Sequence, residues 1–254
     1  MRGRTLISSF FLFFFILSPP IFAQEVLSPT EIVKRSDDLM RGNSTTGIYT
    51  MEILTPNWQR KLELHVDSVG RDQVFIRILS PAKEAGIGTL RIKNEMWNYL
   101  PQVEKVIKIP PSMMMQSWMG SDFANDDLVK ESSVVHDYTH QIVETINIDG
   151  HEVHKIEFIP KPKAAVVWGR LFRWVRKDDF VPLQEEFYSE KGKLIKVLKY
   201  SDIGTVSNRL IPKVWTMTSM IKPGHQTVIR LVDVQYDLSL DPNIFTLSYL
   251  QKIP

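Results

Sequence analysis

Most of this chain alternates hydrophobic and polar positions with the period of a β-strand. In residues 58–69 the apolar side chains share one side and the polar side chains the other: Trp58, Leu62, Leu64 and Val66 against Gln59, Lys61, Glu63 and His65. A period of two predicts a sheet with one face in water. Further strands are predicted at residues 46–54, 73–79, 89–92, 95–101, 103–110, 139–148, 151–160, 169–177, 183–189, 193–203, 212–221 and 227–238.

These strands predict one large antiparallel sheet. Short turn sequences join several of them, among them Asp149-Gly150 and the stretch 190–193. About a dozen strands follow one another without a tandem repeat, so we expect them to pair in a single meandering order. Open sheets of more than about ten strands rarely stay flat. We therefore expect this sheet to curl.

Two segments have a helical pattern instead. Residues 28–42 begin with Ser28 as N-cap and Glu31 in a capping box, and Gly42 ends them. The apolar residues of this helix share one face: Ile32, Val33, Leu39 and Met40. Residues 125–135 begin with one asparagine and two aspartates, which predicts a second, short helix in mid-chain. We expect both helices to cover the concave face of the curled sheet.

The segment before the second helix is rich in large hydrophobic residues. Residues 113–119 contain Met113, Met114, Met115, Trp118 and Met119. Methionine is unbranched and polarizable, so a methionine-rich cover can repack around ligands of different shape. The alternative is an ordinary core that holds a helix on a sheet, and composition alone favours that alternative.

The first 23 residues have the organisation of an export signal. Arg2 and Arg4 precede an apolar run at residues 6–17, and the small residue Ala23 follows a pair of prolines. The run is shorter than the roughly 20 apolar residues that span a bilayer. We therefore predict a cleaved signal peptide at residues 1–23 and one domain at residues 24–254, soluble in the periplasm.

The absence of cysteine and the charge balance exclude several classes of protein. A chain without cysteine has no disulfide, no thiol catalysis, no cysteine-bound zinc and no lipidated cysteine as an anchor. Without Arg2 and Arg4 the 31 basic residues fall to 29, which equals the 29 acidic ones. A balanced chain has no overall charge that attracts nucleic acid. Residues 168–177 interleave aromatic and basic residues, but in an exported, neutral chain we interpret them as a strand.

The histidines offer weak candidates for a metal site. His151 and His154 are three apart in a predicted strand and therefore point to opposite faces. His136 and His140 are four apart where a helix gives way to a strand, and no glutamate occupies the zinc-hydrolase position between them. We expect no metal at either pair.

Three aspartates near the second helix raise the question of calcium. Asp122, Asp126 and Asp127 lack the spacing of a known calcium loop, so we interpret them as helix-capping residues. The sequence also has no nucleophile elbow and no phosphate loop. We expect neither a cofactor nor enzymatic activity.

Residues 113–140, MMMQSWMGSDFANDDLVKESSVVHDYTH, resemble the segment that marks the LolA-like outer-membrane lipoprotein-sorting proteins. Residues 166–203, 209–237 and 242–250 are also similar to that family, and the Gly-Ser-Asp-Phe block at residues 120–123 is fairly specific. The resemblance implies a half-open β-barrel of about eleven antiparallel strands, covered by the N-terminal helix and a mid-chain helical lid. A lipid, or the acyl chains of a lipoprotein, would lie between sheet and lid.

On this resemblance we expect a periplasmic carrier that moves acylated cargo toward the outer membrane. Its implied partners are the lipid or lipoprotein cargo, an inner-membrane transporter and an outer-membrane acceptor. Two alternatives stay open, a lipid-modifying hydrolase on the same scaffold and an accessory subunit of a lipid-exporting transporter. The candidate ligand-binding residues are Met113, Met114, Met115, Trp118, Met119, Phe123, Trp97, Phe172 and Trp174.

The better-known carriers of that superfamily use an arginine to hold the lid closed. The sequence does not single out its counterpart here. Four arginines of predicted strands are candidates: Arg60, Arg77, Arg91 and Arg170.

Overall fold

The computed structural model describes residues 27–130, 134–164 and 166–252, so the predicted signal peptide at residues 1–23 lies outside the described residues. Within them, thirteen strands form one sheet. The strands are β1 (Ser44–Leu54), β2 (Gln59–Val69), β3 (Gln73–Ser80), β4 (Gly88–Ile92), β5 (Glu95–Leu100), β6 (Lys105–Lys108), β7 (Tyr138–Ile148), β8 (His151–Pro160), β9 (Arg170–Arg176), β10 (Pro182–Tyr188), β11 (Leu194–Val206), β12 (Arg209–Ser219) and β13 (Gln226–Tyr236). The sheet thus has slightly more strands than the resemblance implies.

The order of the strands departs from a single meander at one place. The order is β6-β5-β4-β3-β2-β1-β13-β12-β11-β10-β9-β8-β7, and all neighbours are antiparallel. The chain therefore starts in the middle of the sheet, runs outward to one edge at β6, crosses to the opposite edge at β7 and returns to pair β13 with β1. Local turn signals cannot reveal the pairing of β1 with β13, because those strands are far apart in sequence.

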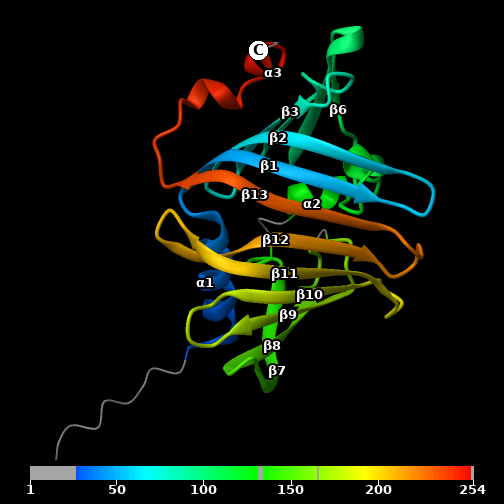
Figure 1. Ribbon diagram of the computed structural model, residues 1–254. Coiled ribbons are helices and arrows are strands. Elements are labelled where there is room, and N and C mark those ends of the chain that lie inside the picture. The colour runs from blue at the N-terminus through cyan, green and yellow to red at the C-terminus, as the bar shows by residue number, and fades with distance from the viewer. Residues whose placement is uncertain (1–26, 131–133, 165, 253–254) are drawn as a thin grey trace, which may run out of the picture.

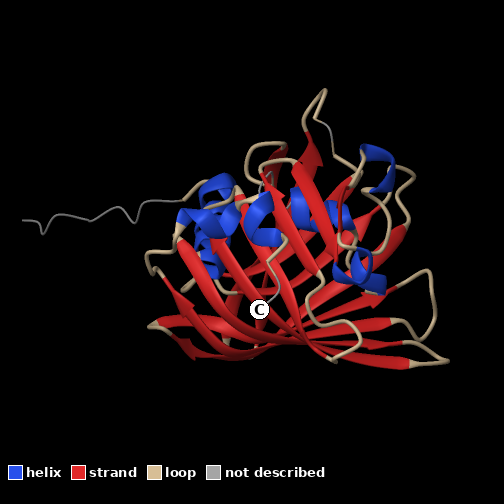
Figure 2. Ribbon diagram, turned by 90° about the horizontal axis from the view of Figure 1, so that it is seen from above, coloured by secondary structure: helices blue, strands red, loops and turns tan. Residues whose placement is uncertain are grey.

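The sheet curls around its helices, as Figure 2 shows from above. Helix α1 (Pro29–Arg41) contacts β7, β9 and β12. Helix α2 (Asn125–Lys130) and the short helical turns η2 (Pro111–Met113) and η3 (Trp118–Gly120) belong to the crossover between β6 and β7. In Figure 1 the helices α1 and α2 lie behind the strands of the sheet. The predicted architecture, a curled antiparallel sheet covered by two helical segments, is confirmed.

Helix α1 begins and ends as its sequence predicts. The Glu31 backbone N–H donates to the Ser28 hydroxyl at 3.2 Å, and Gly42 ends the helix with a φ of 63°. Ile32 and Val33 are buried against the strands, as expected. The buried face also includes the polar residues Ser36 and Asp37, which the apolar pattern does not predict.

The outer face of the sheet is also covered at one place. The C-terminal turns η5 (Pro242–Phe245) and α3 (Leu247–Leu250) pack on Phe75 and Leu90 of β3 and β4. The Arg77 guanidinium donates to the Leu250 carbonyl at 2.8 Å. Strand β3 is therefore buried on both faces, which explains why its centre lacks alternation.

Candidate functional site

A cavity of about 250 Å³ lies between the concave face of the sheet, helix α1 and the crossover from β6 to β7. Most of its wall is apolar. The sheet contributes Leu64, Val66, Ile76, Leu171, Phe187, Leu198, Trp215, Met217 and Ile229, and the crossover contributes Trp118, Phe123 and Val134. We call the described residues of this crossover, 109–130 and 134–137, the lid.

The Gly-Ser-Asp-Phe block shapes the lid around Trp118. Gly120 adopts a φ of 75°, and the Ser121 hydroxyl donates to the Trp118 carbonyl at 2.7 Å. The resulting tight turn directs Trp118 inward, where it is 3% exposed and its indole N–H donates to Thr89 at 3.2 Å. Trp118 therefore helps to anchor the lid to the sheet.

The methionines of the lid lie beside the cavity. Met113, Met114 and Met119 are partly buried and pack against the core cluster that contains Met51 and Leu62. Met115 is 52% exposed. Of the predicted ligand-binding residues of the lid, only Trp118 and Phe123 are among the residues that line the cavity. That any of these residues binds a ligand stays a prediction.

The other three predicted site residues lie on the outer face. Leu171 and Arg173 of β9 line the cavity, so Phe172 and Trp174 point away from it. The Lys155 ammonium lies 4.7 and 4.9 Å from their ring centroids.

Trp97 of β5 packs against the outer cluster around Phe75 and Leu90. The period of two distinguishes the two faces of a strand, but it does not say which face is concave. Trp97, Phe172 and Trp174 were predicted from the sequence to bind the ligand, but they do not line the cavity.

A nearly buried ion pair joins the lid to the sheet. The Lys196 ammonium of β11 binds the Asp127 carboxylate of α2, and the side chains are 6% and 11% exposed. The ammonium also lies 4.8 and 4.9 Å from the ring centroids of Trp168 and Phe187. The Ala124 N–H donates to the same carboxylate at 2.6 Å, which is the helix-capping role predicted for Asp127.

Two further polar contacts hold the tip of the lid. The Arg60 guanidinium of β2 donates to the Met119 carbonyl and forms an ion pair with Glu84 at 3.4 Å. The Thr227 hydroxyl of β13 donates to the Asp122 carboxylate at 2.8 Å. Of the four candidate arginines, Arg60 is therefore one that contacts the lid.

The remaining candidate arginines have other described partners. Arg77 donates to carbonyl groups of Gly86 and the C-terminal turn. Arg91 lines the cavity and donates to the Arg71 carbonyl at 2.6 Å, and Arg170 pairs with Glu157 at 3.1 Å.

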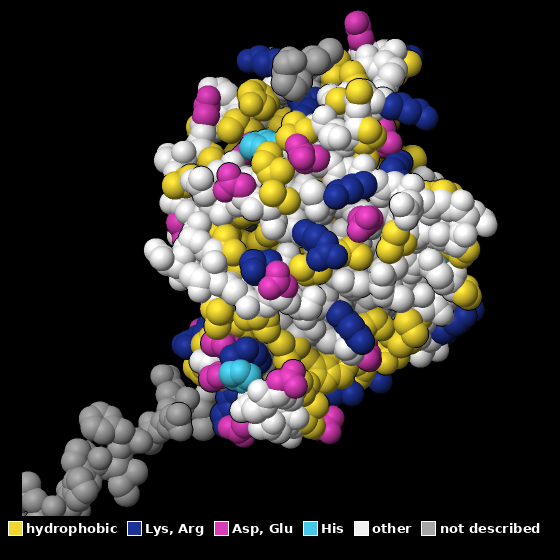
Figure 3. Space-filling model, in the orientation of Figure 1, with side chains coloured by type: hydrophobic (Ala, Val, Ile, Leu, Met, Phe, Trp, Pro, Cys, Tyr) yellow, Lys and Arg dark blue, Asp and Glu magenta, His cyan; other side chains and the backbone are white. Residues whose placement is uncertain are grey.

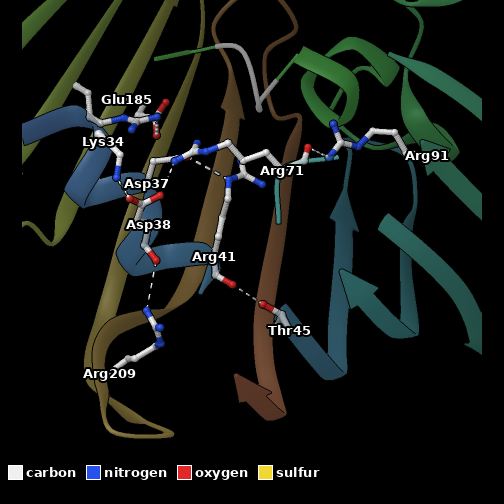
Figure 4. Close-up of polar contacts among 10 residues, drawn as sticks. Lys34, Asp37, Asp38, Arg41, Thr45, Arg71, Arg91, Glu185 and Arg209 are labelled. Atoms are coloured by element: carbon white, nitrogen blue, oxygen red, sulfur yellow. Dashed lines mark hydrogen bonds and ion pairs between the residues drawn. The ribbon is translucent and has the colours of Figure 1, made fainter. Parts of the chain in front are cut away.

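One part of the cavity wall is charged. Asp37 of α1 is 4% exposed and pairs with Arg41 at 3.2 Å and with Arg71, as Figure 4 shows. Arg71 also binds Asp38 at 2.5 Å. These pairs tie α1 to the turn between β2 and β3, beside the cavity. Buried charges require such partners because desolvation penalises an isolated charge.

A second charged group lies on the other half of the sheet. The guanidinium of Arg173 and the carboxylate of Glu185 are 3.1 Å apart, and the Tyr200 hydroxyl donates to Glu185 at 2.8 Å. We did not predict a role for these residues from the sequence. The period of two along β9 predicts the burial of Arg173, because this residue lies between Leu171 and Val175 on the same buried face.

The histidines do not gather into a metal site. Within the described ranges no group of three or more potential metal ligands is present. His151 binds Asp178 at 2.8 Å, and His154 binds Thr145 at 2.9 Å. His140 contacts the Val134 carbonyl at 2.9 Å, and burial lowers the pKa of its imidazole.

The fold and the sequence agree on a family. Residues 70–252 match the model of a family described as an uncharacterized protein, and this match and the fold together support the LolA-like family. The chain belongs to the LolA-like family. A search of proteins with curated functions found no match to the chain.

Solved structures share this LolA-like fold. A putative outer membrane lipoprotein-sorting protein domain from Vibrio parahaemolyticus matches with a TM-score of 0.78 and 22% identity, over 88% of this chain and 98% of that one. A DUF1329 family protein from Desulfovibrio piger matches with a TM-score of 0.80 and 24% identity, over 87% and 97%. A LolA superfamily protein from Nitrosomonas europaea matches with a TM-score of 0.75 and 22% identity, over 88% and 100%. At these identities the likeness shows the fold.

In the part of the chain that the structure describes, no helix is long and apolar enough to cross a membrane.

Proposed function

We propose that this LolA-like protein is a periplasmic carrier that holds a lipid, or the acyl chains of a lipoprotein, between its sheet and its lid. The observation that carries the proposal is the largely apolar cavity beneath a lid that polar contacts fasten to separate strands. The lipoprotein-sorting description of the structure from Vibrio parahaemolyticus supports the same cargo.

We infer that the lid moves, because the cavity is small for a lipid. Ligand pockets usually measure about 300–1,000 Å³, whereas this cavity measures about 250 Å³. A long acyl chain therefore needs more space than the closed protein offers. Displacing the lid would enlarge the cavity without disturbing the pairing of the strands, because the lid is a single crossover between the two sheet edges.

Transfer between a membrane and such a cavity needs little energy. Burying apolar area contributes about 25 cal/mol per Å² in either environment, so moving an acyl chain from bilayer to cavity is nearly balanced. A modest difference in affinity between donor, carrier and acceptor then sets the direction. This logic fits a carrier that exchanges cargo with an inner-membrane transporter and an outer-membrane acceptor.

The first test is mass spectrometry of lipids that copurify with the protein from periplasm. Intact acylated molecules support the carrier. Lyso-lipid or free fatty acid would favour the hydrolase on the same scaffold.

The second test is binding of a fluorescent fatty acid to delipidated protein. Phe123→Ala changes the cavity wall, and Phe172→Ala changes a matched side chain on the outer face. We expect the first change to weaken binding about tenfold, or about 1.4 kcal/mol, and the second to leave it unchanged. Equal effects, or no binding by the unmodified protein, would contradict the proposal.

A further inference from the structure

Two neighbouring hairpin tips expose large hydrophobic side chains at one end of the sheet. Trp58 precedes β2 and is 47% exposed, while Met220 and Ile221 follow β12 and are 50% and 45% exposed. The two tips are in contact, because Gly224 of the second tip lies against the Pro56 ring of the first. A Cβ atom added to Gly224 would lie only 2.9 Å from that ring. In Figure 1 both tips lie at the right-hand end of the sheet. We call residues 55–58 and 219–225 the apolar tip.

Three lysines lie in or beside the apolar tip. Lys222 is part of it, and the neighbouring β10–β11 hairpin, residues 189–193, adds the exposed residues Lys191 and Lys193. The Met220 N–H donates to the Ile195 carbonyl at 2.8 Å, which joins this hairpin to the apolar tip. Across the three tips the sequence has three lysines against one acid, Glu190.

The tip differs from the broad face of the sheet. Figure 3 shows basic and acidic side chains scattered together over the face that is turned toward the viewer. Isolated exposed hydrophobic residues are normal on protein surfaces. A tip that combines an exposed tryptophan, methionine and isoleucine with lysines nearby has instead the composition that suits the boundary between lipid headgroups and acyl chains.

We infer that the apolar tip docks on an anionic lipid surface. Trp58, Met220 and Ile221 would enter the headgroup boundary, and Lys191, Lys193 and Lys222 would meet lipid phosphates. Each lysine near an anionic membrane strengthens binding roughly fivefold.

The apolar tip lies close to a residue that contacts the lid. The Arg60 guanidinium lies 6.0 Å from the Trp58 ring centroid, and the same guanidinium donates to the Met119 carbonyl of the lid. Docking would therefore bring the contact between Arg60 and the lid close to the membrane surface, where cargo would enter or leave. The inference goes beyond the proposed function, because docking requires a bilayer surface and not an occupied cavity.

Cosedimentation of the mature protein with vesicles tests the inference. The vesicles contain phosphatidylcholine with or without phosphatidylglycerol. We expect binding to the anionic vesicles, and we expect it to weaken about tenfold or more in a Trp58→Ala, Ile221→Ser variant. Replacing Lys191, Lys193 and Lys222 by glutamine should abolish the preference for anionic lipid. Val232→Ser is the matched control, because Val232 is 61% exposed on β13 outside the tip.

Thermal unfolding of each variant checks that these changes at exposed positions leave the fold intact. Equal vesicle binding by the tip variant and the control, or no binding to anionic vesicles by the unmodified protein, would overturn the inference. Binding of the fluorescent fatty acid is measured in parallel without vesicles. If the unmodified protein binds the fatty acid but not the anionic vesicles, the docking surface alone is rejected. If it binds the anionic vesicles but not the fatty acid, the carrier alone is rejected.

Discussion

The ion pair between Lys196 and Asp127 offers a quantitative test of how the lid is held. An exposed pair contributes about 0–1 kcal/mol, but these side chains are only 6% and 11% exposed. Removing one partner of a buried pair costs roughly 3–5 kcal/mol, because the other charge stays buried without its counter-charge. We predict that Lys196→Met destabilises the closed lid by about 3 kcal/mol. The free energy of lid opening and the free energy of global unfolding should each fall by up to that amount.

The double variant Lys196→Met, Asp127→Asn should recover most of the loss. Asparagine keeps an oxygen for the Ala124 N–H and leaves no buried charge. Methionine still fills the space between Trp168 and Phe187. We expect the double variant to lie within about 1 kcal/mol of the unmodified protein, and the double-mutant cycle to give a coupling energy of about 2 kcal/mol or more.

The assay is amide hydrogen exchange together with denaturant unfolding. A loss of about 3 kcal/mol corresponds to roughly hundredfold faster exchange in residues 113–127. Strands β1 and β2 serve as an internal reference, because global unfolding alone would affect them as well. If the Lys196→Met protein keeps its stability to within about 0.5 kcal/mol, or the double variant is no better than the single one, the pair does not hold the lid.

Three further changes probe the lid and the site. Trp118→Ala should lower the free energy of unfolding by about 3–5 kcal/mol. Met115→Ala, at an exposed position, should change it by less than about 0.5 kcal/mol in the same denaturant experiment, and a loss similar to that of Trp118→Ala would show that Met115 is a core residue. Arg60→Ala removes a contact made to the closed lid, so stopped-flow mixing should show about tenfold faster entry of a fluorescent fatty acid, and an unchanged rate would mean that Arg60 does not limit opening. Burial lowers the pKa of His140, so its stabilising contribution is full above its ordinary pKa of 6.5 and is lost as pH falls through the lower folded value. Acidification from about pH 7 to about pH 5 should therefore lower the melting temperature of the unmodified protein more than that of His140→Gln, and identical pH profiles would exclude this role.

Local patterns in the sequence predict much of the fold. The alternation is confirmed in the first half of β2, where Leu62 and Leu64 are buried and Lys61 and Glu63 are exposed. Trp58, which was predicted on the apolar side, is 47% exposed, and Asp67 on the polar side is buried. The capped helix is confirmed in α1. These features depend on residues close together in the chain, so their physical causes can be recognised in the sequence.

The candidate site could be predicted only in part. The Met-rich segment does lie in a lid over a cavity, and Trp118 lines that cavity. Three of its methionines, Met113, Met114 and Met119, however, pack on the core beside the cavity. Asp37 and Arg173 are buried at the cavity wall although a charged residue usually faces water. Their burial depends on partners from other elements, namely Arg71 of the β2–β3 turn and Glu185 of β10.

The sequence by itself determined the strands, the caps of α1 and the mid-chain break that became the lid, because each follows from contacts between near neighbours. Only the tertiary structure decided that β13 returns to β1, that the lid spans from one sheet edge to the other, and that Phe172 faces outward while Arg173 faces the cavity. Alternation separates the two faces of a strand, but the direction of curling chooses the concave one. That direction is a property of all thirteen strands together, and no single segment carries it.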